Sequence, residues 1–314
     1  MDEQKESKMM IRVRTIKITM LIILFVSIKS FAQTDSDDKK PKRDKSRKGF
    51  HAGLYVGSYF ANRSTATIYD GYGFDQYGMK NNFANSFMYN RIVNDYGGGN
   101  GLPDQIALAL NVNHGDWSFN ETDMPTKMKY NPAILVGLHT MYGFTQKDAL
   151  IFNATGTKLT ASGAFTITLN TTPVGYQQPG YLNVQTFGIT GGEERALFQI
   201  GYRRILGDDD VFNFFIEGGP EINLAKFVKN QVTINNLVID MAAYYNNPYY
   251  PMYHEKILIG EGLGVFGGLG LNITAGAKYN LQFVYNPSFE KINIGANPQF
   301  KWQHALGLRA YYNL

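Results

Sequence analysis

The strongest constraint in this sequence is an alternation of apolar and polar residues with a period of two, which recurs from Phe50 to the C-terminus. In the last segment, one face carries large apolar side chains, and the other carries lysine, glutamine, glycine and arginine. The first face comprises Phe300, Trp302, His304, Leu306, Leu308, Ala310, Tyr312 and Leu314. Successive residues of a strand point to opposite faces, so the pattern predicts β-strands with one apolar side.

The same alternation predicts seven further strands, within residues 50–60, 134–144, 165–169, 198–203, 212–224, 257–273 and 279–286. Short links fall at 145–148, 207–210 and 274–277, and long links fall at 62–130, 171–193, 229–255 and 287–297. Short turns on one side and long loops on the other are typical of outer-membrane barrels. We therefore predict an all-β fold, a transmembrane antiparallel up-and-down β-barrel of eight strands with large extracellular loops.

The composition of the second face separates a membrane barrel from a soluble one. A lipocalin-like barrel has an apolar interior and a polar outer surface. Here the second face carries glycine, asparagine, glutamine and glutamate, which suits a polar interior better than a lysine-rich solvated surface. The chain also holds 21 tyrosines and 21 phenylalanines, which fit aromatic girdles at the membrane interfaces. We expect the chain to lie in the bacterial outer membrane.

Five charged residues are expected to point into the barrel: Arg203, Glu217, Glu221, Lys301 and Arg309. Eight strands leave an interior that side chains can just fill. An unpaired buried charge is costly, so opposite charges are expected to pair there. This favours a structural plug over a pore.

The N-terminus carries two segments that precede the barrel at 49–314. Residues 1–32 have a basic start, an apolar run of 11 residues at Ile18–Ile28 and a small-residue site at Ser30 and Ala32, a pattern typical of a secretory signal peptide. The run is too short for a transmembrane helix, which needs about 20 residues. Residues 33–48 hold seven basic residues and four aspartates, and we predict a disordered basic periplasmic arm. The arm is either a solvated leader or a contact for anionic lipid or a partner.

Charge and cysteine content exclude several functions. The net charge of +4 comes from the N-terminal segments, because residues 49–314 carry 17 basic and 19 acidic residues. A body with a net charge of −2 lacks the basic footprint of a nucleic-acid binder. The chain has no cysteine, which excludes disulfides, thiolate metal sites and a cysteine nucleophile.

The long loops are the candidate partner surfaces. In the insertion at 62–130, residues 79–93 have near-helical apolar spacing, and residues 105–110 form a short helix or strand. Its Trp117 and Phe119 belong either to a folded cap on the barrel or to an aromatic docking surface for a protein or glycan. A later loop is rich in tyrosine, which suits partner contacts or a membrane girdle. These tyrosines are Tyr244, Tyr245, Tyr249, Tyr250 and Tyr253.

The sequence offers no recognisable catalytic motif. Its five histidines lack zinc-binding spacing, and it has neither a nucleophile elbow nor a Walker loop. We therefore predict no catalytic residues, no cofactor and no metal, and a protein that is not an enzyme. A hydrolase with His114 or His254 at the outer rim remains an alternative.

Taken together, these features resemble a known group. The signal peptide ending Phe31-Ala32-Gln33, the eight glycine- and tyrosine-rich strands and the segment Asn131–Leu138 resemble the small outer membrane beta-barrel domain proteins, which include PorT-like and OmpA/OmpX-type eight-stranded barrels. The resemblance implies an accessory subunit of an outer-membrane secretion or assembly complex. We accordingly predict a structural or partner-binding barrel that contacts outer-membrane lipid and protein partners. A narrow channel or ligand-binding porin is the alternative.

Overall fold

The structure is a computed structural model of the chain. It describes residues 47–75, 77, 79–95, 101–170, 183–207, 211–241, 259–275, 278–294 and 298–313. The predicted signal peptide, most of the basic arm and the tyrosine-rich loop lie outside these residues. All that follows concerns the unit Ser46–Leu314.

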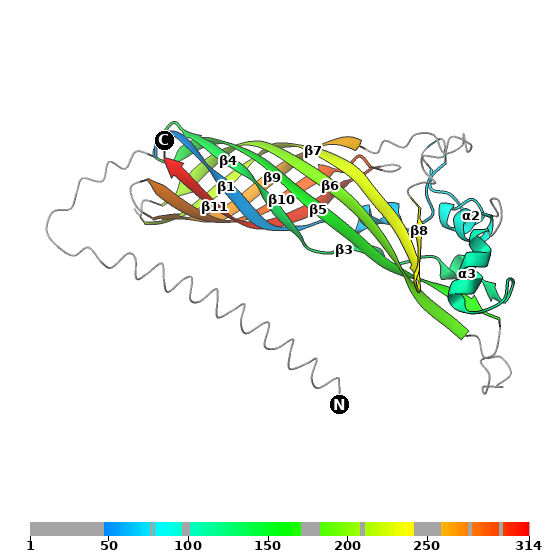
Figure 1. The fold of residues 1–314 in the computed structure, drawn as a ribbon. Helices are drawn as coiled ribbons and strands as arrows, with labels where there is room; N and C mark the ends of the chain where they lie inside the picture. Colours follow the sequence, from blue (N-terminus) through cyan, green and yellow to red (C-terminus); the bar gives the residue numbers. More distant parts are fainter. Residues whose placement is uncertain are drawn as a thin grey trace, which may run out of the picture. The chain divides into compact units, whose positions relative to one another are not determined.

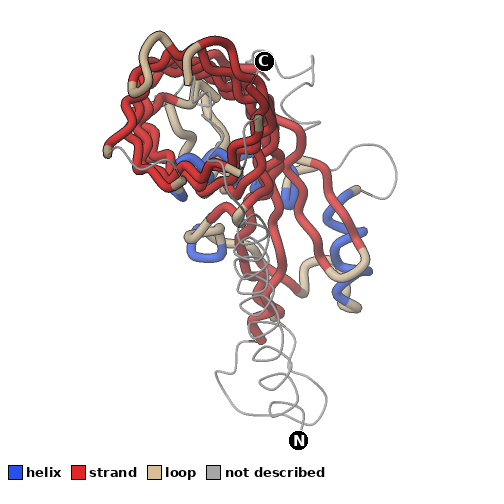
Figure 2. The backbone as a smooth tube through the Cα atoms, turned by 90° about the vertical axis from the view of Figure 1, so that its left-hand side faces the viewer, coloured by secondary structure: helices blue, strands red, loops and turns tan. Residues whose placement is uncertain are grey.

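Eight antiparallel strands close into a barrel (Figures 1 and 2). In the order of the ring they are β1 (Gly49–Phe60), β4 (Ala133–Gly143), β5 (Asp148–Leu169), β6 (Asn183–Leu206), β7 (Phe212–Ile234), β9 (Ile259–Thr274), β10 (Tyr279–Lys291) and β11 (Phe300–Asn313). The ring closes where β1 pairs with β11, with Tyr55 opposite Arg309. The predicted fold class and strand number are confirmed.

The barrel wall is apolar outside and polar inside. Large apolar side chains lie exposed on its outer surface: Leu54, Val56, Val136, Leu138, Phe152, Phe198, Ile200, Phe214, Ile216, Ile222, Leu263, Leu269, Phe283 and Leu308. The inward positions of the same strands hold buried polar residues, among them Asn153, Gln199, Asn213, Asn272, Gln282 and Gln303. Alternating lipid-facing and lumen-facing positions define a transmembrane barrel.

Three neighbouring strands continue beyond the barrel at the end opposite the short turns (Figure 1). Strands β5, β6 and β7 have 22, 24 and 23 residues, whereas β1 has 12. A short strand, β8 (Leu237–Asp240), pairs with the end of β7. Three predicted long links are therefore wrong in part: 183–193, 229–234 and 237–240 are strand, and β10 extends to Lys291.

The apolar side of these strands changes face where they leave the barrel. In β5, Leu150 and Phe152 point outward, but Phe165, Ile167 and Leu169 are buried on the inner side. The outward positions beyond the barrel carry small polar or charged residues: Lys158, Thr160, Ser162, Thr166 and Thr168. The expectation that the 165–169 segment belongs to the lipid-facing alternation is therefore wrong, because outside the membrane its apolar face must be covered by protein.

The insertion between β1 and β4 supplies that cover. It contains η1 (Arg63–Tyr69), α2 (Phe87–Val93), α3 (Leu102–Leu110), β2 (Trp117–Ser118), η2 (Glu121–Asp123) and β3 (Lys129–Tyr130). Helical structure starts at Phe87, because Ser86 Oγ accepts a hydrogen bond from the Tyr89 amide at 3.1 Å and caps the helix. The predicted helical spacing from Met79 is therefore realised only over its second half.

The insertion and the extended strands share one hydrophobic core. Phe87, Met88, Ile92, Ile106 and Phe119 from the insertion are buried in the same cluster as Phe165, Ile167, Phe187, Ile189, Val232 and Ile239 from the strands. We call this folded unit the extracellular platform; it comprises the described part of 61–132 with residues 158–169, 183–194 and 226–240. Among the described residues, no helix is both long and apolar enough to cross a bilayer.

Candidate functional site

The periplasmic half of the barrel interior holds three paired charges, Arg203, Glu217 and Arg309, which we call the charged triad. Arg203 donates to Glu217 Oε2 from two nitrogens at 3.0 and 2.8 Å. From β11, Arg309 donates to Glu217 Oε2 at 2.9 Å and to Oε1 at 2.8 Å. All three side chains are fully buried. The ring of Tyr55 lies against Arg309, with the guanidinium carbon 4.8 Å from the ring centre.

A row of amides and a carboxylate crosses the middle of the interior. Asn153 donates to Gln199 Oε1 at 2.9 Å, and Gln199 donates in turn to Glu221 and to Asn286 Oδ1, the latter at 3.1 Å. His139 joins this row to the triad, because its Nδ1 lies 2.6 Å from Asn153 Oδ1 and its Nε2 lies 3.3 Å from a guanidinium nitrogen of Arg203. Side chains from strands on opposite sides of the barrel therefore meet in its centre.

A second charged network lies at the extracellular mouth. Arg195 donates to Glu193 and, at 3.1 Å, to the hydroxyl of Tyr59. The Tyr59 hydroxyl donates to Glu290 Oε1 at 2.8 Å, and Asn223 donates to the other oxygen of Glu290 at 2.7 Å. These residues come from four different strands, so the network ties the mouth of the barrel across its diameter.

The platform reaches down into this network. Tyr69 at the end of η1 and Tyr130 in β3 both donate to Glu193 Oε2, at 3.0 and 2.6 Å. Burial raises the pKa of both phenols well above the usual value, and the charge of Glu193 raises it further. Both hydroxyls therefore stay protonated and act as donors. From β6, Arg195 also donates to Thr65 Oγ1 of η1 at 3.3 Å.

A glycine makes the close packing of η1 possible. The ring of Tyr69 lies over Gly191, where an added Cβ would sit 2.2 Å from Cγ of the tyrosine. Any larger residue at this position would push η1 away from β6. The ring also stacks on Phe227 of β7, with 5.4 Å between ring centres. Helix η1 is thereby fixed over the mouth of the barrel.

These contacts lie at several levels of the barrel interior. Its lumen is crossed by side-chain networks from the periplasmic half to the mouth, and η1 is anchored to the uppermost network. Within the described ranges, no group of three or more metal-ligating side chains could hold a metal ion. The arrangement supports rigidity and a fixed platform, because removing the arginine or the glutamate of a buried ion pair leaves the other charge uncompensated.

The structure places the predicted interior charges as follows. Arg203, Glu217, Glu221 and Arg309 are buried in the lumen. Lys301 lies in the inward-facing row of β11 but is only half-buried, opposite Glu290 near the extracellular end.

Sequence reasoning missed Glu193, Arg195 and Glu290. Glu193 and Glu290 lie in segments that we expected to be loops. The alternation that would have revealed Glu290 is present as Phe283, Tyr285 and Phe289, but Pro287 interrupts it.

The predicted aromatic contacts have different positions. Phe119 is buried in the platform core, with its ring 6.1 Å from that of Phe165, which fits the folded-cap alternative rather than the docking surface. Trp117 is half-buried and pairs with Leu169 in the β2–β5 ladder. Tyr244, Tyr245, Tyr249, Tyr250 and Tyr253 lie outside the described residues. His114, a candidate in the hydrolase alternative, lies 2.7 Å from the exposed Asp104.

Comparison with known proteins gives similarity in structure only. No family model matches the sequence, and no curated protein matches it. The outer membrane protein OprG of Pseudomonas aeruginosa aligns over 85% of this chain and 97% of its own, with a TM-score of 0.37 and 8% identity. Neisserial surface protein A aligns over 84% and 96% (TM-score 0.33, 7% identity), and Ail of Yersinia pestis over 84% and 98% (TM-score 0.29, 8% identity).

The ring of strands itself defines the class of protein. An eight-stranded antiparallel barrel with an apolar outer wall, a polar interior, short turns at one end and long excursions at the other is a small outer-membrane β-barrel. The chain is therefore an integral protein of the bacterial outer membrane. It differs from a minimal barrel of this class in its extracellular platform.

Proposed function

We propose that this chain is a non-conducting, non-enzymatic barrel that serves as a partner-binding accessory subunit of an outer-membrane assembly or secretion complex. The observation that carries the proposal is the platform, in which an insertion of about 70 residues and three extended strands share one core. Loops of this size are usually functional. A rigid platform fixed to a plugged barrel is suited to holding a partner at the cell surface.

The interior supports a structural role for the barrel. Three arginines and four glutamates are buried in the lumen of the described structure: Arg195, Arg203, Arg309, Glu193, Glu217, Glu221 and Glu290. Charged side chains joined by hydrogen bonds and ion pairs across the lumen fill the space that a narrow channel would need to keep open. The channel alternative therefore has less support than the accessory role.

The outer face of the extended strands offers a surface for a partner. It is mostly uncharged, with Thr160, Thr186, Thr190 and Thr233 at outward positions. Val184 and Val238 are also exposed there, each by more than half of its surface. A sheet face of threonine and valine carries few charges, so it can pack against another protein with little desolvation cost.

Site-specific photo-crosslinking in the native host tests the proposal. A crosslinker at Val184 or Val238 is expected to give one discrete protein adduct, whereas a crosslinker at the lipid-facing Leu206 is expected to give none. The double variant V184D/V238D, without a crosslinker, should lose the corresponding complex on a native gel, while the barrel keeps its heat-modifiable migration. Monomer alone at both platform positions, or stable conductance from the pure protein in a planar bilayer, would contradict the proposal.

A further inference from the structure

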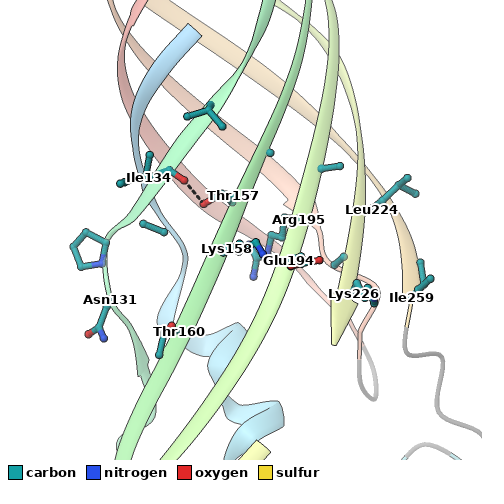
Figure 3. A pocket seen from close by; sticks show the side chains of 16 residues that line it. Asn131, Ile134, Thr157, Lys158, Thr160, Glu194, Arg195, Leu224, Lys226 and Ile259 are labelled. Atoms are coloured by element: carbon teal, nitrogen blue, oxygen red, sulfur yellow. Dashed lines mark hydrogen bonds and ion pairs between the residues drawn. The ribbon is translucent and has the colours of Figure 1, made fainter. Parts of the chain in front are cut away.

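The outer wall of the barrel contains a groove beside the platform (Figure 3). It has a volume of about 970 Å³ and crosses β4, β5, β6 and β7. Its walls include Ile134, Val136, Ala196, Leu224 and Ile259, and its upper rim includes Lys158, Glu194 and Lys226. The groove therefore joins an apolar floor to a charged edge.

The strand register explains why the wall is hollow at this level. Gly156 lies opposite Ala196, and Ala196 lies opposite Leu224, in one outward-facing row. The next row toward the periplasm holds the bulky Phe198 and Ile222. A Cβ added to Gly156 would have the Arg195 carbonyl oxygen, 3.8 Å away, as its nearest contact. Internal packing therefore does not require the small residues, and the space outside them is open to a ligand.

The charged edge is one row farther out. Lys158 lies opposite Glu194, and Glu194 lies opposite Lys226. Lys158 Nζ is 2.9 Å from Glu194 Oε1, and the lysine side chain is 85% exposed. Two ammonium groups flank a single carboxylate, so the edge carries an excess of positive charge. Its position marks the level at which the outward-facing residues change from apolar to polar.

We propose that this groove binds a lipid of the outer leaflet that carries a phosphate headgroup. Acyl chains lie over Ala196 and Leu224 on the apolar floor, and the phosphate lies between Lys158 and Lys226. The occupant is a lipid because the floor is part of the membrane-facing wall. Its headgroup is anionic because the edge is net positive at the depth where headgroups lie. Glu194 lies between the two lysines and offsets only one of their two positive charges.

The test uses the full-length protein in nanodiscs of uncharged phosphatidylcholine, with bound lipid counted by native mass spectrometry. Diphosphoryl lipid A is the probe, and dephosphorylated lipid A and inorganic phosphate are the comparison ligands. We expect one retained lipid A per barrel and weak retention of the dephosphorylated form. The charge variant K158Q/K226Q should bind the probe about tenfold more weakly, because two charge-assisted hydrogen bonds are lost.

Two further variants separate the groove from general surface charge. G156L/A196L fills the floor without changing charge, faces lipid and so leaves the barrel folded; it should weaken retention to a similar degree. K147Q removes a lysine from the opposite rim and should leave retention unchanged. Equal retention by wild type and both groove variants, or equal retention of dephosphorylated lipid A, would overturn the proposal. Binding of inorganic phosphate as tight as that of the lipid would also overturn it, since the site would then be ionic only.

Discussion

The same strands have opposite polarity inside and outside the membrane. In the barrel wall, β5 and β6 present Phe152 and Phe198 to the outside and Asn153 and Gln199 to the lumen. Beyond the wall, the same two strands bury Phe165, Ile167, Phe187 and Ile189 on the inner side and expose threonine on the outer side. Successive side chains continue to point to alternate faces along the whole of each strand, and only the surrounding medium changes. Period two therefore predicts a strand, but the medium on each side decides which face is apolar.

The largest effect is expected from the barrel half of this comparison. Glu217→Gln keeps the shape of the side chain but leaves Arg203 and Arg309 buried without their shared carboxylate. Removing one partner of a buried ion pair costs about 3–5 kcal/mol. The urea concentration at which the barrel loses its heat-modifiable gel shift in lipid vesicles measures the effect.

Glu194→Gln is the matched control on the outside of the wall. Its partner Lys158 is exposed, so the loss should stay below about 1 kcal/mol. If both variants unfold at the wild-type urea concentration, the lumenal triad does not hold the barrel together, and the interior is not the more tightly coupled region.

The next largest effect distinguishes the platform from the barrel wall within strand β5. Phe165→Ala removes a ring from the platform core and should destabilise that core by about 3 kcal/mol. Phe152→Ala removes the same ring from the lipid-facing wall and should leave the platform unchanged. Limited proteolysis of the protein in intact vesicles measures opening of the platform. Faster cleavage in both variants, or in neither, would mean that the platform and the wall do not respond separately.

A charge placed on the outer face tests the change of medium directly. Phe198→Arg puts a cation against the lipid in the outer part of the wall and should cost about 2 kcal/mol. Thr186→Arg puts the same cation on the outer face of the same strand in the platform, where water surrounds it, and should stay within about 0.5 kcal/mol. Urea unfolding in vesicles compares the two variants. A similar cost for both would place the platform face inside the membrane.

The same comparison explains which parts of the fold the sequence predicts. The alternation and the short turns predict the eight-stranded ring and the inward direction of Arg203 and Arg309. They do not predict the length of β5, β6 and β7, because the outer residues of these strands have the small polar side chains and glycines that also occur in loops. Residues 183–193 contain three glycines and two threonines, a composition that is found in both strands and loops.

The interior networks are harder to predict for a different reason. Glu193 and Glu290 belong to strands whose outer ends look like loops, and their partners Tyr69 and Tyr59 are distant in sequence. Only the ring order brings these groups to the barrel mouth. The buried position of Phe119 likewise depends on the inner face of β5, which the sequence alone assigns to the wrong medium.

The smallest effect is expected from a titratable group of the platform. Burial raises the pKa of Asp70 above its usual value of 3.8, although Lys80, 2.6 Å away, partly offsets this. Between the unfolded and folded pKa values, the folded platform binds more protons than the unfolded one. The platform therefore becomes slightly more stable as the pH falls through this window, and this added stability is lost as the pH rises above the folded pKa.

Proteolysis of the platform should become slower on moderate acidification. Asp70→Asn should remove this response, and the exposed Asp104→Asn should retain it. An unchanged response in Asp70→Asn would assign the pH dependence to another group. The proposed contrast between a platform interior that buries a titrating carboxyl and an exposed outer face would then lose its support.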